Sequence, residues 1–139
     1  MALPSGSRLP RPSVIASQRR VVEQAEEYVR ARIASSVRLP SLCRIVGRSE
    51  RGLRNAFYSV RGMSPARCLL LDRLHGVRHA LSSPGASRTT VTEVATSYGF
   101  YELGRFAARY KKAFGEAPSA TMRHTNQASA SERPTEGSR

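Results

Sequence analysis

Apolar residues recur at three- and four-residue spacing along most of the chain, which is the pattern of amphipathic helices. Val22, Ala25, Val29 and Ile33 predict a first helix over residues 17–34. Further helices are predicted over residues 39–46, 50–61, 65–82, 91–97 and 102–114. No stretch alternates between apolar and polar residues as a half-buried strand does, so the predicted fold class is all-α.

Two stretches of the chain repeat one another. The repeated patterns are Cys43-x3-Gly47-x5-Leu53-x3-Phe57-x4-Gly62-x2-Pro65 and Ala95-x3-Gly99-x6-Phe106-x3-Tyr110-x4-Gly115-x2-Pro118. The offset is 52 residues before a one-residue insertion and 53 residues after it. The small residue lets a second helix approach, the glycine accepts the left-handed conformation of a turn, and the later apolar residue fills the shared core. Each half is therefore predicted to be a helix-turn-helix.

The segment between the repeats predicts one long helix that joins them. Leu70, Leu74, Val77 and Leu81 form an apolar stripe on this helix, whose length corresponds to a rod of about 25 Å. The two ends of the chain are poor in apolar residues, and we expect both to be disordered. The predicted organisation is a disordered arm (1–16), a first helix-turn-helix subdomain (17–64), a linker helix (65–82), a second helix-turn-helix subdomain (83–124) and a disordered tail (125–139).

The central part of the chain carries a large excess of positive charge. The 139 residues include 23 Lys and Arg against 10 Asp and Glu, a formal net charge of +13. Residues 1–16 contribute +2 and residues 125–139 contribute zero, which leaves +11 on residues 17–124. This charge attracts phosphate and predicts double-stranded DNA as the partner. All the basic residues except Lys111 and Lys112 are arginines, whose planar forks grip phosphate or guanine in a bidentate manner.

The sequence lacks the features of several other classes of protein. No apolar run approaches the ~20 residues that cross a bilayer, and the chain does not open with the charged and apolar stretches of a secretory signal. Cys43 and Cys68 lie inside helical patterns as reduced cysteines do, so we expect a cytoplasmic protein. No catalytic triad, paired-carboxylate site, phosphate loop or CxxC motif occurs, which predicts that the protein is not an enzyme and needs no cofactor.

The helix predicted over residues 50–61 has one apolar and one polar side. On a helical wheel Arg51 and Asn55 point away from the apolar residues, and Arg54 lies on a flank. Arginine pairs with guanine N7 and O6 in the major groove, and asparagine pairs with adenine N6 and N7. We therefore expect these three residues to read bases, with Arg48 and Ser49 contacting the DNA backbone. The alternative is an arginine-rich face that is merely solvated.

The helix predicted over residues 102–114 offers a different set of outward residues. Gly104, Ala107 and Ala108 are its candidate base-reading positions, and an alanine there could touch a thymine methyl group. Its basic residues favour contacts with the DNA backbone over base readout. These candidate backbone contacts are Arg105, Arg109, Lys111 and Lys112.

Together these features resemble the DNA-binding domain of the AraC/XylS family of bacterial transcription regulators, over residues 17–123. The stretches that carry the resemblance are residues 47–57, Gly62-Met63-Ser64-Pro65 leading to Arg73-Leu74, residues 94–100 and Phe114-Gly115-x-x-Pro118. The resemblance implies a homeodomain-like pair of units that activates transcription through contact with RNA polymerase. It also implies base reading by Arg51, Arg54 and Asn55 in the first unit and by positions 103, 104, 107 and 108 in the second. Because the arm is short, we expect no small-molecule effector domain ahead of these units.

The chain departs from the family's pattern mainly in the second unit. Leu103, Gly104 and Ala108 stand where polar residues and an arginine are usual, and Thr121 stands where a tyrosine is common. Gly52 and Gly104 each weaken a helix by roughly 1 kcal/mol relative to alanine. The second unit could therefore bind mainly the DNA backbone. A general nucleic-acid binder, or a degenerate copy without specific readout, is the alternative function.

A metal-responsive regulator is a third hypothesis, which depends on residues along the linker helix. His75 and His79 stand four residues apart, and Asp72 could add a third ligand beside Cys68. The four residues span too much helix to hold one ion together, so no metal site is predicted. His124 is predicted to be an isolated surface residue.

Overall fold

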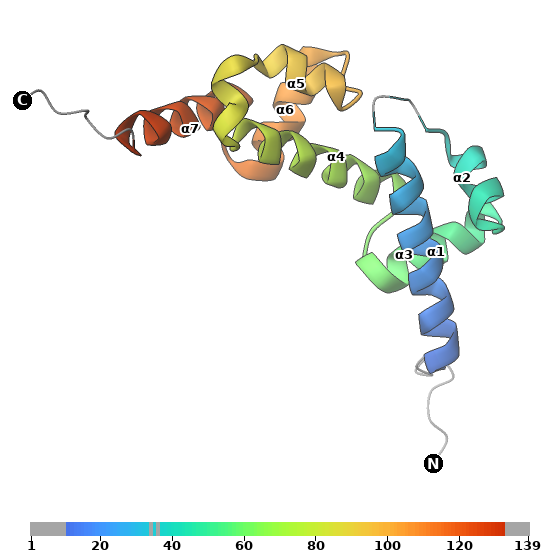
Figure 1. The fold of residues 1–139 in the computed structure, drawn as a ribbon. Coiled ribbons are helices and arrows are strands. Elements are labelled where there is room, and N and C mark those ends of the chain that lie inside the picture. Colours follow the sequence, from blue (N-terminus) through green and yellow to red (C-terminus); the bar gives the residue numbers. More distant parts are fainter. Residues whose placement is uncertain (1–10, 34, 36, 133–139) are drawn as a thin grey trace, which may run out of the picture. The chain divides into compact units, whose positions relative to one another are not determined.

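The computed structural model describes residues 11–33, 35 and 37–132, and all the regular structure in this part of the chain is helical, which confirms the predicted all-α class. The helices are α1 (Pro12–Ala31), α2 (Leu39–Val46), α3 (Glu50–Arg61), α4 (Pro65–Leu81), the short 3₁₀ helix η1 (Pro84–Arg88), α5 (Val91–Ser97), α6 (Leu103–Phe114) and α7 (Pro118–Glu132) (Figure 1). The chain forms two compact units, residues 11–31 with 37–69 and residues 32, 33 and 35 with 70–132. None of the helices in the described ranges is both long and apolar enough to span a bilayer.

Helix α1 begins earlier than the sequence predicts, so the expected disorder is wrong for residues 12–16. Pro12 occupies the first helical position, where the missing N–H would have no partner in any case. The guanidinium of Arg48 donates to the hydroxyl of Ser17 at 3.0 Å and ties the start of α1 to the turn before α3. Helix α1 ends at Ala31, three residues before the predicted end, and the rest of the predicted arm, residues 1–10, lies outside the described residues.

The core of the first unit forms where α1 packs on α2 and α3. Val22 and Ala25 of α1 are buried together with Leu53 and Phe57 of α3. Gly47, with φ of 66°, gives the turn between α2 and α3 its left-handed conformation, and its N–H donates to the Cys43 carbonyl. The bounds predicted for α2 and α3 are confirmed. Gly47 and Gly62 end the two helices, and the regularly spaced apolar residues of each helix are the ones that are buried.

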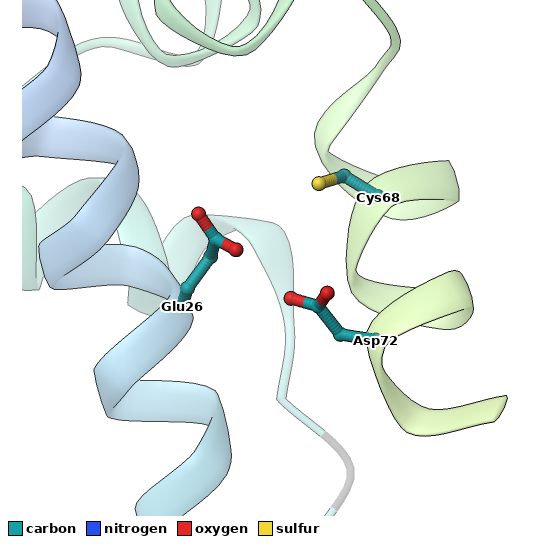
Figure 2. Close-up of side chains that lie close together, drawn as sticks. All are labelled: Glu26, Cys68 and Asp72. Atoms are coloured by element: carbon teal, nitrogen blue, oxygen red, sulfur yellow. The ribbon is translucent and has the colours of Figure 1, made fainter. Parts of the chain in front are cut away.

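A buried ion pair that the sequence analysis missed joins α1 to the end of α3. The carboxylate of Glu26 is 4% exposed, and its Oε1 accepts from Nε and Nη2 of Arg61 at 3.1 and 2.7 Å. Figure 2 shows this carboxylate beside the thiol of Cys68, which α4 contributes to the same core; Asp72, the other residue drawn, belongs to the second unit. Glu26 lies one position from Ala25 on the buried side of α1, where a lone carboxylate would be costly.

The core of the second unit gathers around the later part of α4. Leu74, Val77 and Leu81 are almost fully buried in one cluster with Phe106 and Tyr110 of α6, which confirms the predicted apolar stripe. Helix α4 differs from the predicted linker because no part of it is a free spacer. Its first residues, through Leu69, belong to the first unit, and the remainder belongs to the second.

The connection from α4 to α5 is ordered by a short helix and by the capped start of α5. Residues Pro84–Arg88 form η1, in which Ala86 is buried. The Thr90 hydroxyl accepts from the Glu93 N–H at 3.1 Å and caps α5. The Glu93 carboxylate accepts from the Thr89 hydroxyl at 2.8 Å.

Gly76 lets α4 and the end of α5 approach closely. A Cβ atom at this position would lie 2.3 Å from Cε1 of the Tyr98 ring, far inside van der Waals contact. Tyr98 is half-buried against the second core. Glycine is therefore required at position 76 for reasons of packing, although a mid-helix glycine costs about 1 kcal/mol in propensity.

Helix α7 occupies much of the predicted tail, so the expected disorder is wrong for residues 125–132. The buried hydroxyl of Tyr110 donates to Oγ1 of Thr121 at 2.8 Å, and Oγ1 of Thr121 donates to Glu116 at 2.6 Å. Burial raises the pKa of Tyr110 above its ordinary value of 10.0, which keeps the phenol protonated as a donor. These bonds, with Pro118 buried, anchor α7 on α6, and the helix then continues through a polar sequence. Residues 133–139 lie outside the described residues.

We expect Arg61→Ala to lower the free energy of unfolding by about 3 kcal/mol, because it leaves the buried Glu26 carboxylate without its closest cation. Arg54→Ala is the matched control. It breaks the ion pair with Glu50, whose partners are both 55% exposed, and should cost about 0.5 kcal/mol. Urea unfolding followed by circular dichroism compares the two. Equal effects would contradict the importance assigned to the buried pair.

We expect Gly76→Ala to destabilise the second unit by about 1–2 kcal/mol, because the clash with Tyr98 outweighs the better helix propensity of alanine. Gly104→Ala provides the comparison, since an added Cβ at position 104 meets no atom of the described residues within 4 Å. That variant should be neutral or gain up to about 1 kcal/mol. Thermal unfolding measures both, and a stabilised Gly76→Ala protein would refute the close contact.

Candidate nucleic-acid interface

Helix α3 presents the polar face that the sequence predicts. The hydroxyl of Ser49 accepts from the Gly52 N–H at 3.1 Å and caps the helix, as expected from its position before Glu50. The apolar side is buried through Leu53, Ala56 and Phe57. This burial fixes the rotation of the helix about its axis, so that Arg51, Arg54 and Asn55 are all exposed on one surface.

These exposed side chains differ in what holds them. Arg54 forms an ion pair with Glu50 one turn earlier on the same helix. Within residues 11–33, 35 and 37–132, Arg51 and Asn55 make no hydrogen bond or ion pair, so their polar groups face solvent. Arg48 is predicted to contact the DNA backbone. In the structure its guanidinium donates to the Ser17 hydroxyl of α1.

Helix α6 is the counterpart of α3 in the second unit. Phe106 and Tyr110 bury its apolar side, and the Tyr110 ring lies 5.8 Å from Phe106 and 4.7 Å from Phe114 between centroids. Gly104 and Ala108 are exposed and Ala107 is half-buried. The structure therefore places these three candidate positions on the outer side of α6.

The predicted basic residues of α6 are all exposed. They are Arg105, Arg109, Lys111 and Lys112. Nε of Arg105 lies 3.3 Å from a carboxylate oxygen of Glu102, a residue that the sequence analysis did not single out. The pair could have been predicted from the sequence, because residues three apart on one helix are neighbours.

A hollow of about 360 Å³ lies beside the start of α6. The residues that line it are Gly99, the buried Phe100 and Phe106, and the exposed Tyr101, Glu102, Arg105 and Arg109. The sequence analysis named the two arginines as separate contacts with the DNA backbone. The structure brings them to one concave surface.

The two units share backbone geometry at the repeated glycines. Gly47 and Gly99 have φ of 66° and 86°, and Gly62 and Gly115 have φ of 72° and 77°. The predicted duplication is therefore present in the backbone as well as in the sequence. The side chains at the candidate reading positions differ: the first unit has arginine and asparagine there, and the second has glycine and alanine.

The structure does not assemble the metal site considered from the sequence. Neither His75 nor His79 joins a group of three close metal-ligating side chains in the described part of the chain. The His75 ring instead packs edge-on against Phe114, with centroids 5.1 Å apart. His124 lies on the surface, as predicted, but it is not isolated: its Nδ1 lies 3.2 Å from a Glu116 carboxylate oxygen.

Comparison with known proteins agrees with this geometry. The model of a family described as a helix-turn-helix domain matches residues 42–124. The XylDLEGF operon transcriptional activator of Pseudomonas putida is 35% identical over 101 residues, which are 73% of this chain and 32% of the activator. The chain thus spans about a third of the length of that relative.

Solved structures show the same architecture. The crystal structure of a probable AraC family transcriptional regulator from Rhodopseudomonas palustris is 40% identical, with a TM-score of 0.67, over 76% of this chain and 97% of that one. The DNA-binding domain of AdpA, a global transcriptional factor solved with a target DNA, is 22% identical with a TM-score of 0.64. That alignment covers 86% of this chain and 97% of the other, and it shows a common fold.

Proposed function

The chain belongs to the AraC family of helix-turn-helix proteins, and we propose that it is a sequence-specific DNA-binding regulator that reads two successive major grooves. The observation that carries the proposal is the exposed face of α3, where Arg51 and Asn55 face solvent in a chain of net charge +13. The packing of Leu53 and Phe57 holds the backbone behind that face. A helix held in this way can present several side chains to base edges at once.

The first unit supplies hydrogen-bonding readout in this proposal. Arg51 and Arg54 would each grip O6 and N7 of guanine, and Asn55 would pair with N6 and N7 of adenine. Arg54 would exchange its exposed ion pair with Glu50 for the base, at small cost because exposed pairs are weak. Each bidentate contact discriminates by ~1–3 kcal/mol.

Basic residues around the two reading helices supply affinity without sequence information. They are Arg48, Arg105, Arg109, Lys111 and Lys112, with the Ser49 hydroxyl as a further phosphate donor. Each phosphate that they neutralise releases counterions, so binding should weaken steeply with salt. The concave surface that carries Arg105 and Arg109 suits the rounded edge of a sugar-phosphate strand.

We further propose that the chain activates transcription, since the Pseudomonas relative is named a transcriptional activator. In this proposal it acts in the bacterial cytoplasm through contact with RNA polymerase. It would act as a DNA-binding protein with no reaction of its own and no cofactor. The competing function, general nucleic-acid binding, is favoured by the net charge alone. It does not account for an exposed Asn55 beside two arginines.

Selection of duplexes from a random pool at fixed salt tests the proposed function. We expect enrichment of a bipartite motif whose two half-sites have centres about 34 Å apart, one helical turn, because each reading helix would occupy its own major groove. Enrichment of no motif would favour general nucleic-acid binding. A single half-site would indicate that the second unit only grips the backbone.

Two substitutions test the roles assigned to the side chains. Arg51→Ala should reduce affinity for the selected duplex by ~1–3 kcal/mol and relax specificity at one base pair. Lys112→Ala should weaken binding to all duplexes evenly and lower the slope of log K against log salt by about one. Fluorescence anisotropy titrations over a range of salt concentrations measure both quantities. An equal loss of selectivity in the two variants would overturn the assignment.

A further inference from the structure

The repeat aligns the reading positions of the two units one by one. The offset of 53 residues that relates Leu53 to Phe106 also pairs the polar residues on α3 with residues on α6. The pairs are Glu50 with Leu103, Arg51 with Gly104, Arg54 with Ala107 and Asn55 with Ala108. Every polar reading position of the first unit is thus apolar, or lacks a side chain, in the second.

These residues form one surface on α6. Positions 103, 104, 107 and 108 span about 140° of a helical wheel at 100° per residue. Leu103 is 40% exposed although it is large and apolar. Arg105, the basic residue between them in sequence, is paired with Glu102. At these four positions the face that corresponds to the reading face of α3 therefore offers carbon atoms rather than hydrogen-bond donors, and the exposed Lys111 follows one turn after Ala107 on the same side.

Gly104 makes room for no neighbouring atom among the described residues. Gly76 makes room for Tyr98, and a Cβ at Gly52 would come within 3.3 Å of the Ser49 hydroxyl that caps α3. A Cβ at Gly104 would meet no described atom within 4 Å, and its backbone is helical rather than left-handed. A glycine that weakens a helix and relieves no internal contact suits a position where an external surface approaches the backbone closely.

The face is also held rigidly enough to recognise small groups. Phe106 and Tyr110 are almost fully buried behind it, and the Tyr110 hydroxyl is fixed by Thr121 of α7. This network fixes the rotation and depth of α6 in the second unit. A methyl-sized feature can therefore be matched to a particular side chain.

We propose that the second unit reads thymine, through contact of its C5-methyl groups with the exposed Leu103 and Ala108. The C5-methyl group is the one apolar feature that base pairs present in the major groove, and alanine and other apolar side chains recognise it. The proposal rests on the function proposed above, in which α6 enters a major groove. It assigns hydrogen-bonded readout to one half-site and methyl readout to the other.

The proposal predicts a specific sensitivity to a single carbon atom. Deoxyuridine has the hydrogen-bonding groups of thymidine but lacks the methyl. Burial of one methyl corresponds to about a fourfold change in affinity. Replacing each thymine in turn by deoxyuridine, in the tightest selected duplex, should give about a fourfold loss at one or two positions of a single half-site.

A double variant ties this loss to α6. Leu103→Asn/Ala108→Asn makes both exposed positions polar and places at 108 the residue that its counterpart, Asn55, carries. We expect the variant to bind thymine and uracil duplexes equally at the sensitive positions. Ile45→Asn is the matched control, since Ile45 is 44% exposed in the first unit, and it should retain the discrimination. A thermal melt of each variant confirms that it is folded.

The possible results separate the two proposals. If the chain selects no duplex over scrambled DNA, the proposed function fails and this inference fails with it. If a duplex is selected but its half-sites lack thymine, or no uracil substitution lowers affinity, only the inference is overturned. It is also overturned if the double variant still prefers thymine at the same positions. Sensitivity that disappears in the double variant and persists in Ile45→Asn supports it.

Discussion

The left-handed turn at a glycine between two crossing helices is the constraint on which this structure depends. Gly47 and Gly99 adopt it, and in both units the small residue four positions earlier, Cys43 or Ala95, lies in or against the core. Once the turn is set, burial of Leu53 and Phe57 in α3, or of Phe106 and Tyr110 in α6, decides which side of the following helix faces outward. The chemistry of the exposed face then varies without changing the backbone.

The two units use this freedom in opposite ways. At the candidate reading positions α3 offers charged and amide groups, whereas α6 offers carbon atoms and a bare backbone at Gly104. Each reading helix is supported by a polar link that lies away from that face. In the first unit the support is the Glu26–Arg61 ion pair, and in the second it is the hydrogen bond from Tyr110 to Thr121. Specific recognition needs such support because a displaced side chain loses its bidentate geometry.

Membership of the AraC family was predicted from the glycine, proline and aromatic spacing, and the comparisons bear it out over residues 42–124. The helices with clear start and stop residues were also predicted well. The starts of α3 and α5 follow from the caps Ser49 and Thr90, and the ends of α2 and α3 follow from Gly47 and Gly62; these signals act over three or four residues. The exposure of the candidate reading residues followed from helical periodicity alone, while their contact with bases stays a prediction.

The sequence by itself determined the repeated helix pairs, their turns and the chemistry of the two outward faces, because these depend on residues close together in the chain. Only the tertiary structure decided what depends on distant partners. The start of α1 and the length of α7 were misjudged from composition, since Arg48 in the turn before α3 and Tyr110 of α6 stabilise these two helices. The burial of Glu26 likewise requires Arg61, which is 35 residues away, and no local sequence pattern predicts such a pair.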